Sequence, residues 1–413
     1  MRESPLSSGE RTKLAELAKR ARKILLTENL HQVAFHDTPV LLVGATYPGA
    51  WLEHNQDALL LAKFVPEARE IAWANVEVFL KRQRADGLFP FCIPKTYAPD
   101  AYFNADALYW QVQSVFPFVR CAVEIADLAE RPEEDFVRIY KAGCRYDEWF
   151  RNFRDRAGTG LVEMFCEFDT GHDNSPRVID GGIPHSCPDN DAVNMPALPC
   201  MPIQAADLSA TRFGDRVALA ALAERLGRPH EAAQWRADAA ALKAKMKELL
   251  YDPETDFYYD RSPQGLRKYR TEHITRLFLS HVLDQEEFDR IYKRYFENPA
   301  EFDAPFPYPA VSLSDPSFVK DCPRNCWGAN CQANTAERAI FWLQEYHRKD
   351  ELERLLAEWT RLLVASDGDF GQEVNPFTRN ILPSGGKYTP TLLICLVAKQ
   401  FLNDDESCVK VST

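Results

Sequence analysis

The chain has 413 residues, of which 46% are hydrophobic, and this is enough for a large buried core. Its 61 acidic residues outnumber its 49 lysines and arginines, which gives a net charge of −12. An acidic chain without a basic block is a poor partner for nucleic acid or for an anionic membrane surface, and no stretch approaches the roughly 20 apolar residues of a membrane span.

The N-terminal segment and most of the cysteines favour a cytoplasmic protein. The segment lacks an apolar signal core, and its apolar residues between Leu14 and Leu25 mark one face of an amphipathic helix. The eleven cysteines form an odd set. Because Cys121, Cys144 and Cys395 lie inside helical apolar patterns, we expect reduced, buried thiols rather than a disulfide framework.

A separate group of cysteines lies in one loop, at Cys322, Cys326 and Cys331. Their spacing fits no common structural zinc site, and no histidine lies nearby. We interpret them as loop thiols, with zinc binding as the alternative. We expect no metal and no other cofactor.

Helical periodicity dominates the chain from end to end. A stripe from Ala232 to Leu249, with alternating spacings of three and four, is the clearest example, and Gly227-Arg-Pro229 separates it from the helix before it. Strand-like alternation is scarce, although Asp256–Asp260 could form a short hairpin edge. In chain order, the other predicted helices cover 10–28, 56–82, 106–128, 134–154, 208–226, 271–281, 284–297, 330–347, 349–366 and 389–403.

Eleven or twelve helices in antiparallel pairs, with no flexible linker, predict an all-α fold closed into a single toroid. We expect one domain over 1–413, with 404–413 as a polar, flexible tail. Alternate loops in a ring of helical hairpins emerge on the same face, so long loops can gather around one pocket. The long loops cover 84–104, 157–205, 299–329 and 367–388.

Two of these loops carry a carboxylate among Gly, Asn, Ser, Thr and Pro. Asp173 lies within 168–177, and Glu373 lies within 367–378. Glycoside hydrolysis needs one carboxylic acid to protonate the leaving oxygen and one carboxylate to activate water or attack. Acidic residues are also common in turns, so these two residues by themselves leave the chemistry open.

Eight motifs then follow one another in a fixed order along nearly the whole chain. They are Tyr47-Pro-Gly-Ala-Trp51, Gln83-Arg-Ala-Asp86-Gly-Leu-Phe-Pro90, Gln113-Ser-Val-Phe-Pro117, Gly160-Leu161 through Gly171-His-Asp173-Asn-Ser-Pro176, Asp207-Leu-Ser209, Pro305-Phe-Pro-Tyr-Pro309 with Ser314-Asp-Pro316, Arg324-Asn-Cys-Trp327, and Glu373-Val-Asn-Pro376-Phe-Thr378. With these motifs the chain resembles glycoside hydrolase family 63 in its mannosylglycerate hydrolase-like branch, and more distantly the neutral trehalases.

The resemblance implies an (α/α)6 barrel that hydrolyses a small α-linked glucoside or mannoside with inversion. It assigns the general acid to Asp173 and the general base to Glu373. In inverting enzymes these carboxyls lie roughly 6.5–9.5 Å apart, and partial burial beside Glu373 would raise the pKa of Asp173. The implied partner is a small carbohydrate, and the sequence does not indicate an oligomeric state.

Further residues are expected around the sugar. Trp51 and Trp327 would stack on it, while Gln113 and Arg324 would bind hydroxyls, although Gln113 could instead cap a helix. His172 contacts the sugar or fills the gap left by a larger family residue, Asn174 orients the acid, and Arg177 ties the loop down or forms a surface salt bridge. The expected sugar-binding set is Trp51, Glu53, Asp57, Gln113, His172, Asn174, Arg324, Trp327, Lys387 and Tyr388.

The chain departs from the family mainly at sugar-contacting positions. Asp169 stands where the family has Glu, Asn375 replaces a tyrosine, and either Glu53 or Asp57 could serve as the acidic contact that follows the N-terminal tryptophan. Both catalytic carboxylates are retained, so we expect altered specificity rather than lost activity. Lys387 and Arg324 would suit a negatively charged substrate.

Two other functions compete with this interpretation. A sugar epimerase or isomerase on the same barrel usually needs a pair of histidines, and only His54, His172 and His185 lie near the candidate loops. A non-catalytic carbohydrate-binding protein would be expected to have lost one of the two carboxylates.

Overall fold

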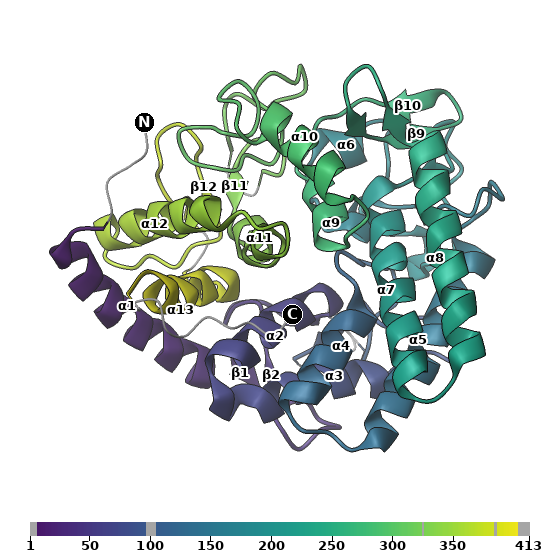
Figure 1. Ribbon diagram of the computed structural model, residues 1–413, viewed down its shortest axis with the longest axis horizontal. Coiled ribbons are helices and arrows are strands. Elements are labelled where there is room, and N and C mark those ends of the chain that lie inside the picture. The colour runs from purple at the N-terminus through teal and green to yellow at the C-terminus, as the bar shows by residue number, and fades with distance from the viewer. Residues whose placement is uncertain (1–5, 96–104, 324–325, 384–385, 404–413) are drawn as a thin grey trace.

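The helices form two concentric layers around a common axis (Figure 1). The computed structural model describes residues 6–95, 105–323, 326–383 and 386–403. The inner layer consists of α2 (Asn55–Phe64), α4 (Phe118–Leu128), α7 (Ala206–Arg225), α9 (Ile274–Leu279), α11 (Ala333–Glu345) and α13 (Thr389–Asn403). The outer layer consists of α1 (Ser8–Thr27), α3 (Arg69–Lys81), α5 (Glu133–Phe153), α8 (Pro229–Leu249), α10 (Gln285–Tyr295) and α12 (Lys349–Ala365).

The inner helices close into a complete ring. Each packs against the next along the chain, from α2 through α4, α7, α9 and α11 to α13, and α13 packs against α2. Inner and outer helices alternate along the chain, so the inner helices all run in the same direction. The fold is therefore the expected (α/α)6 toroid.

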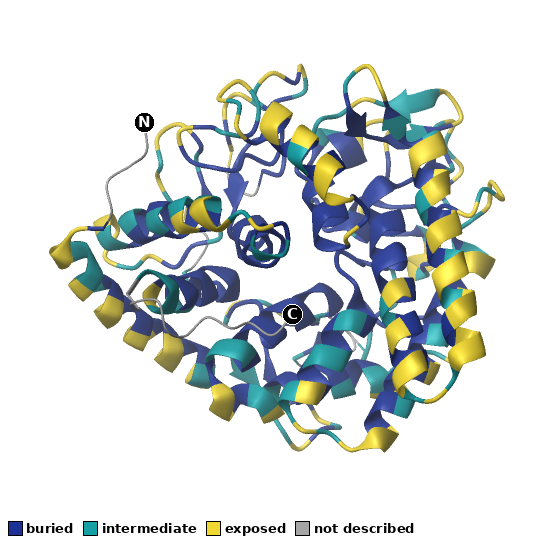
Figure 2. Ribbon diagram, in the orientation of Figure 1, coloured by how far each residue is buried: buried dark blue, intermediate teal, exposed yellow. Residues whose placement is uncertain are grey.

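Burial explains why each helix takes its layer. All residues of α2 from Asn55 to Ala62 are buried, and so are all those of α11 from Ala333 to Leu343. In contrast, α8 buries one stripe, Ala232, Ala239, Leu242 and Met246, and leaves its other face to solvent (Figure 2). A helix that is buried on all sides suits the centre of the ring, and an amphipathic helix suits its rim.

Two predicted helices differ from the structure. The pattern over 56–82 divides into α2 and α3 because Pro66 cannot continue a helix; it begins a 3-10 turn, Pro66–Ala68. The pattern over 106–128 begins too early, since α4 starts only at Phe118. The residues before it are extended, with Leu108 bridging to Cys92 and a φ of 40° at Gln113. A short helix in the acid-bearing loop, α6 (Pro176–Ile179), was not predicted.

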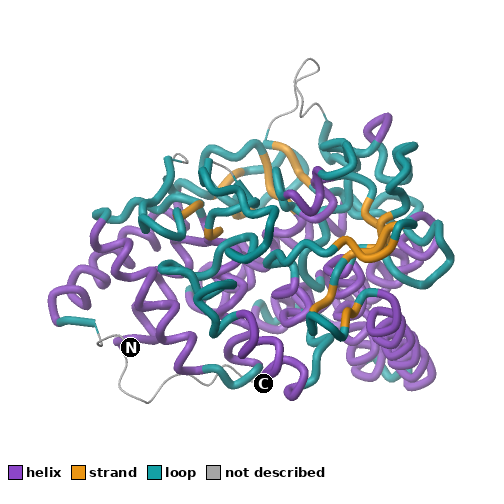
Figure 3. The backbone as a smooth tube through the Cα atoms, turned by 90° about the horizontal axis from the view of Figure 1, so that it is seen from above, coloured by secondary structure: helices purple, strands orange, loops and turns teal. Residues whose placement is uncertain are grey.

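Short antiparallel strands brace the loops on one side of the helical layer (Figure 3). The predicted hairpin near Asp256 forms between β7 and β8. The pairs are β1 (Leu30–His31) with β2 (Val40–Leu41), β3 (Gly49–Trp51) with β4 (Cys92–Pro94), β7 (Tyr251–Asp252) with β8 (Phe257–Tyr258), and β11 (Cys331–Gln332) with β12 (Glu373–Val374). A four-stranded sheet has the order β10 (Gly265–Arg267), β9 (Asp260–Ser262), β6 (Ile203–Gln204) and β5 (Glu163–Met164).

The long loops share one structural property: each leads into an inner helix. The segment after α3 enters α4, the one after α5 enters α7, the one after α10 enters α11, and the one after α12 enters α13. Because the inner helices are parallel, these loops meet at one face of the ring, as the alternation of helices predicted.

None of the helices in the described part of the chain combines the length and hydropathy that a membrane span needs.

The crossing of α5 with its neighbours gives a direct test of the packing. Gly143 lies where α5 meets α4 and α7, and a Cβ added there would lie 2.7 Å from Val119 Cγ2 and 3.0 Å from Leu219 Cδ2. We predict that Gly143→Ala lowers the melting temperature, because overpacking typically costs about 1–3 kcal/mol. Gly9→Ala in α1 is the control, since no atom lies within 4 Å of a Cβ there. Equal or higher melting temperatures for both variants would contradict the packing.

Candidate active site

The candidate site lies at the N-terminal ends of the inner helices. Glu53 lies two residues before α2, Asp207 is the second residue of α7, and Glu272 lies two residues before α9. Glu373 lies in β12, which pairs with β11 just before α11, and opposes Gln332 there. The same ring geometry therefore gathers acidic residues from distant parts of the sequence on one face.

Asp173 lies in the loop that leads into α7. A 3-10 turn, Glu167–Thr170, ends at Gly171, whose φ of 65° suits a residue without a Cβ. A Cβ on Gly171 would lie 3.3 Å from Glu53 Oε2, so the carboxylate of Glu53 rests against the acid-bearing loop. Burial raises the pKa of Asp173 to about 7, and the negative charges of Glu53 and Glu167 act in the same direction. This carboxyl group retains a proton near neutral pH, as a general acid must.

Glu373 is held by donors from the neighbouring loop. Its side chain is 1% exposed. Its Oε2 accepts hydrogen bonds from Asn330 Nδ2 at 2.8 Å and from the backbone N of Cys326 at 3.2 Å. These bonds, together with the β11–β12 pairing, fix the orientation of the carboxylate.

The segment Cys326–Gly328 joins the two carboxyl-bearing loops. Cys326 donates to Glu373, while the next residue, Trp327, packs edge-on against His172 with ring centroids 4.9 Å apart. A Cβ on Gly328 would lie 3.3 Å from Pro176 Cδ, three residues after Asp173. The loop of the expected acid and the loop of the expected base thus meet through three consecutive residues.

A buried ionic network anchors the acid-bearing loop to α7, α9 and β9. Arg177 forms two hydrogen bonds to Asp207, at 2.6 and 2.8 Å, and two to Asp260, also at 2.6 and 2.8 Å. Arg276 bonds to Asp207 at 2.9 Å. Each of these side chains is about 1% exposed or less. Of the two roles considered for Arg177, tying down the loop is the one observed.

His172 belongs to this network through both ring nitrogens. Nδ1 accepts from Arg177 Nη1 at 3.1 Å, and Nε2 faces Glu272 Oε1 and Arg276. Burial lowers the pKa of His172 to about 4, with the charge of Arg276 adding to the effect, so the ring is neutral at pH 7. Its nitrogens are therefore committed to protein partners, and the aromatic ring fills space beside Trp327.

The structure distinguishes Glu53 from Asp57. Glu53 accepts from Gln113 Nε2 at 2.5 Å and from Arg338 at 2.9 Å. Burial raises its pKa, but the charges of His54, Arg338 and Arg276 outweigh burial, so the pKa is lowered overall. Asp57 instead bonds to His54 Nδ1 at 2.9 Å, deeper in α2. Glu53 is the one that reaches the acid-bearing loop.

Gln113 and the aromatic residues complete one side of the site. Gln113 caps no helix, since α4 begins at Phe118 and the Gln113 side chain bonds to Glu53. Trp51 packs edge-on against Tyr47 at 5.7 Å, and the ring of Tyr388 lies 6.0 Å from Tyr47. Tyr47 also donates to Gln372 Oε1 at 2.6 Å, next to Glu373.

Three expected contacts are placed differently or lie outside the described residues. Lys387 is exposed and its ammonium pairs with Glu28, at 2.5 Å, beyond the end of α1. Asn174 is exposed, with a φ of 61°, and its backbone N donates to the carboxylate of Glu167. Arg324 lies outside the described residues, as does the expected tail over 404–413.

The cysteine geometry differs from the zinc alternative. Cys322 and Cys326 pack in a small apolar cluster with Phe318. Within the described residues, ligand atoms close enough for one metal ion come instead from Cys166, Asp169 and Cys187. There Arg154 bonds to both Asp169 oxygens, at 2.5 and 3.2 Å, and reaches Cys187 Sγ at 3.5 Å. The guanidinium already supplies the positive charge that these groups require.

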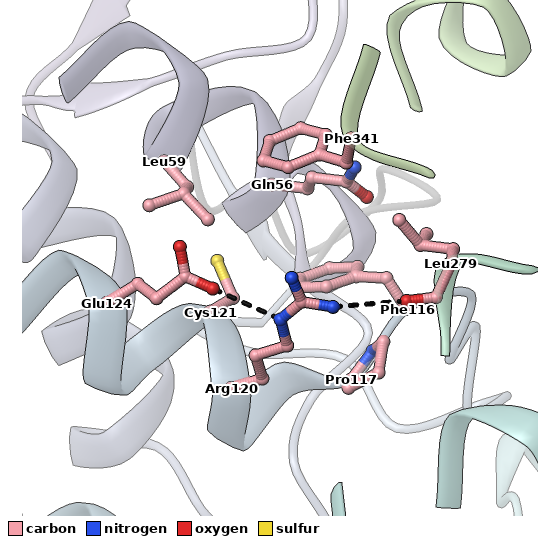
Figure 4. A pocket seen from close by; sticks show the side chains of 9 residues that line it. All are labelled: Gln56, Leu59, Phe116, Pro117, Arg120, Cys121, Glu124, Leu279 and Phe341. Atoms are coloured by element: carbon pink, nitrogen blue, oxygen red, sulfur yellow. Dashed lines mark hydrogen bonds and ion pairs between the residues drawn. The ribbon is translucent and has the colours of Figure 1, made fainter. Parts of the chain in front are cut away.

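A pocket lies between α2, α4, the end of α9 and the second half of α11 (Figure 4). Its walls include Leu279, the last residue of α9, and Phe341 from the second half of α11. Its carboxylate, Glu124, is paired with Arg120 at 3.1 Å and Lys63 at 2.7 Å. Since its lining contributes a single carboxylate, this pocket cannot supply a general acid and a general base.

Sequence reasoning missed the residues that support the site, including Glu167, Asp260, Glu272, Arg276, Asn330 and Arg338. The Asp-Leu-Ser motif gave the signal for Asp207 alone. A buried charge at the start of a helix has the same sequence signature as a solvated one, so no local pattern identifies the others.

The network around Arg177 makes a stability prediction. We expect Arg177→Met to lower the free energy of unfolding by about 3–5 kcal/mol, because it leaves buried carboxylates without their cation. Arg236→Met is the control, since the Arg236–Glu224 pair is more than half exposed and such pairs contribute little. Chemical denaturation measures both. An Arg177→Met protein as stable as the control would contradict the network's supporting role.

The family model for the mannosylglycerate hydrolase MGH1-like glycoside hydrolase domain matches residues 58–388. A comparison with curated proteins found no match. Among solved structures, the GH63 mannosylglycerate hydrolase from Thermus thermophilus in complex with glucose has a TM-score of 0.69 and 19% identity, covering 92% of this chain and 99% of that one.

The neutral trehalase from Saccharomyces cerevisiae has a TM-score of 0.66 and 12% identity, covering 93% of this chain and 80% of that one. A rhamnosidase from Klebsiella oxytoca with rhamnose bound has a TM-score of 0.57 and 15% identity, covering 96% of this chain and 64% of that one. At these identities the structural likeness concerns the fold. The family match spans most of the chain, and the protein therefore belongs to the mannosylglycerate hydrolase MGH1-like family of glycoside hydrolases.

Proposed function

We propose that the protein hydrolyses a small α-linked glucoside or mannoside with inversion of configuration. Asp173 is the general acid and Glu373 the general base. The observation that carries the proposal is the junction at Cys326–Gly328, which links the loop of Asp173, a carboxyl with a raised pKa, to the loop of Glu373, an oriented carboxylate.

The chemistry follows from the two environments. Asp173, with its pKa raised to about 7, gives its proton to the glycosidic oxygen as the bond to the anomeric carbon breaks. Glu373 removes a proton from the water that attacks that carbon from the opposite face. The proton balance is complete after one displacement, since one carboxyl has lost a proton and the other has gained one. No covalent sugar–enzyme intermediate is required.

The polar and aromatic residues of the site suit a sugar ring. Glu53 and Gln113 present polar atoms, and Trp51, Trp327 and Tyr388 contribute aromatic surface, which binds the apolar faces of pyranose rings. Lys387, expected to attract a charged substrate, is engaged with Glu28. Structures of the Thermus thermophilus enzyme hold glucose, or Tris with D-glycerate, so glycosyl-glycerates join α-glucosides and α-mannosides as the first substrates to test.

The cysteines support a cytoplasmic location. The ten cysteines in the described part of the chain are all free, and most of them are buried. Unpaired thiols in this number suit a reducing compartment.

Substitution of the two carboxyls tests the assignment. We expect Asp173→Asn and Glu373→Gln each to reduce kcat/KM by a factor on the order of 10²–10⁴, because each removes one proton-transfer group. Asp189→Asn, an exposed residue of the same long loop, is the control and should retain full activity. Initial rates on a panel of α-glucosides, α-mannosides and glycosyl-glycerates measure the effect. Full activity in either catalytic variant would overturn that residue's role.

The raised pKa of Asp173 predicts the basic limb of the pH profile. The acid must be protonated, so kcat/KM should be constant below pH about 7 and fall above it as Asp173 ionises. The residual activity of Asp173→Asn should lack this limb. Rates measured from pH 5 to pH 9 test both points, and a wild-type profile that stays flat to pH 9 would contradict the protonation state.

A further inference from the structure

A third carboxylate lies buried beside the expected acid. Glu167 begins the 3-10 turn before Gly171, and its side chain is 1% exposed. Its Oε1 accepts a hydrogen bond from the backbone N of Asn174, the residue after Asp173. Its Oε2 faces the Nδ1 atom of His185. Glu167 therefore contacts both the acid-bearing turn and a residue further along the same loop.

His185 holds Glu167 from the solvent side. Its side chain is 70% exposed, and its ring stacks on Phe168 with centroids 5.3 Å apart and planes 22° apart. Two backbone hydrogen bonds hold the two segments side by side. They run from Glu167 N to Pro184 O at 2.9 Å and from Phe168 N to His185 O at 3.2 Å. The contact is thus built from ring stacking, backbone pairing and the approach of His185 Nδ1 to Glu167 Oε2.

The carboxylates around Asp173 differ in whether an arginine or lysine pairs with them. Glu53 pairs with Arg338, and Asp169 pairs with Arg154. Within the described residues, Glu167 contacts His185 and pairs with no lysine or arginine. The charge of Glu167 acts on the acid together with that of Glu53, and both contribute to the raised pKa of Asp173.

We propose that Glu167 is a positioning residue for the general acid, with His185 as its solvent-facing anchor. The proposal rests on the proposed function of Asp173. Glu167 acts in two ways: its bond to Asn174 N fixes the left-handed turn, with a φ of 61°, directly after the acid. Its negative charge disfavours ionisation of the neighbouring carboxyl, which must regain a proton after every turnover.

Two substitutions separate these effects. Glu167→Gln keeps an oxygen that accepts from Asn174 N but removes the charge, whereas Glu167→Ala removes both. We expect Glu167→Gln to retain activity within about threefold at pH 5.5 and to move the basic limb to lower pH, so that activity at pH 8 falls by about three- to tenfold relative to the wild type. Glu167→Ala should show the same movement and an additional loss at every pH.

The matched control is Glu163→Gln. Glu163 is also a buried glutamate of this loop that accepts from two backbone N atoms, those of Arg156 and Ala157 at 2.8 and 2.7 Å, but the charges that raise the pKa of Asp173 are those of Glu53 and Glu167. Its basic limb should stay in the wild-type position. An unmoved limb in Glu167→Gln, or an equal movement in Glu163→Gln, would overturn the proposal.

A surface pair of variants tests the same link without touching the interior. His185→Lys places a permanent positive charge beside Glu167 and should move the basic limb to lower pH, whereas His185→Gln should not. Equal profiles for these two variants would contradict the electrostatic link.

Direct titration separates this proposal from the function of Asp173. In protein labelled with ¹³C at aspartate carboxyls, the signal lost in Asp173→Asn identifies Asp173. A lower Asp173 pKa in Glu167→Gln supports the link, and an unchanged pKa overturns it, whether or not Asp173 is catalytic. Full activity of Asp173→Asn alongside a lowered pKa would instead reject the proposed function and leave the electrostatic link intact.

Discussion

The buried guanidinium of Arg177 is the interaction on which the candidate site depends. It joins the acid-bearing loop to Asp207 at the start of α7 and to Asp260 in β9, and Arg276 extends the network to α9. Charges this deeply buried are tolerated only when each has a partner with good geometry. The loop that carries Asp173 is long, and without this anchor the conformational entropy of its backbone would oppose a single placement of the acid.

Two neighbouring parts of the site differ in how their charges are balanced. Beneath the loop, two aspartates share two arginines, and these charges are paired. Beside the loop, Asp173 faces Glu53 and Glu167, so a further negative charge is unfavourable there. One region therefore stabilises the position of the acid while the other keeps its proton. The division explains how the carboxyl group of Asp173 can be held in place by paired charges and still keep its proton near neutral pH.

Sequence patterns predicted the fold well because the two layers have different patterns of burial. The single stripe of α8 is readable from its spacing, and alternation along the chain requires parallel inner helices. The boundaries were less accurate where extended backbone carries apolar residues, as at Leu108 before α4. There, burial by loops produces a pattern that resembles a helix.

Site residues could be predicted from the sequence only where they belong to a recognisable motif. Asp173 and Glu373 stand in such motifs, and the segment Cys326–Gly328 of a third loop contacts both of the loops that carry them. The partners of these residues come from isolated positions such as Asn330 and Arg338, whose proximity exists only after the ring closes. Lys387 shows the converse, since its position in a loop suggested a sugar contact but its long side chain reaches Glu28 instead.

The anomeric form of the first sugar released tests the central claim most directly. Time-resolved ¹H NMR of an α-linked substrate, recorded faster than the sugar mutarotates, distinguishes one displacement from two. Direct attack of a water activated by Glu373 predicts that the β-anomer appears first and the α-anomer grows in later. Initial release of the α-anomer would show retention of configuration and would contradict the assigned mechanism.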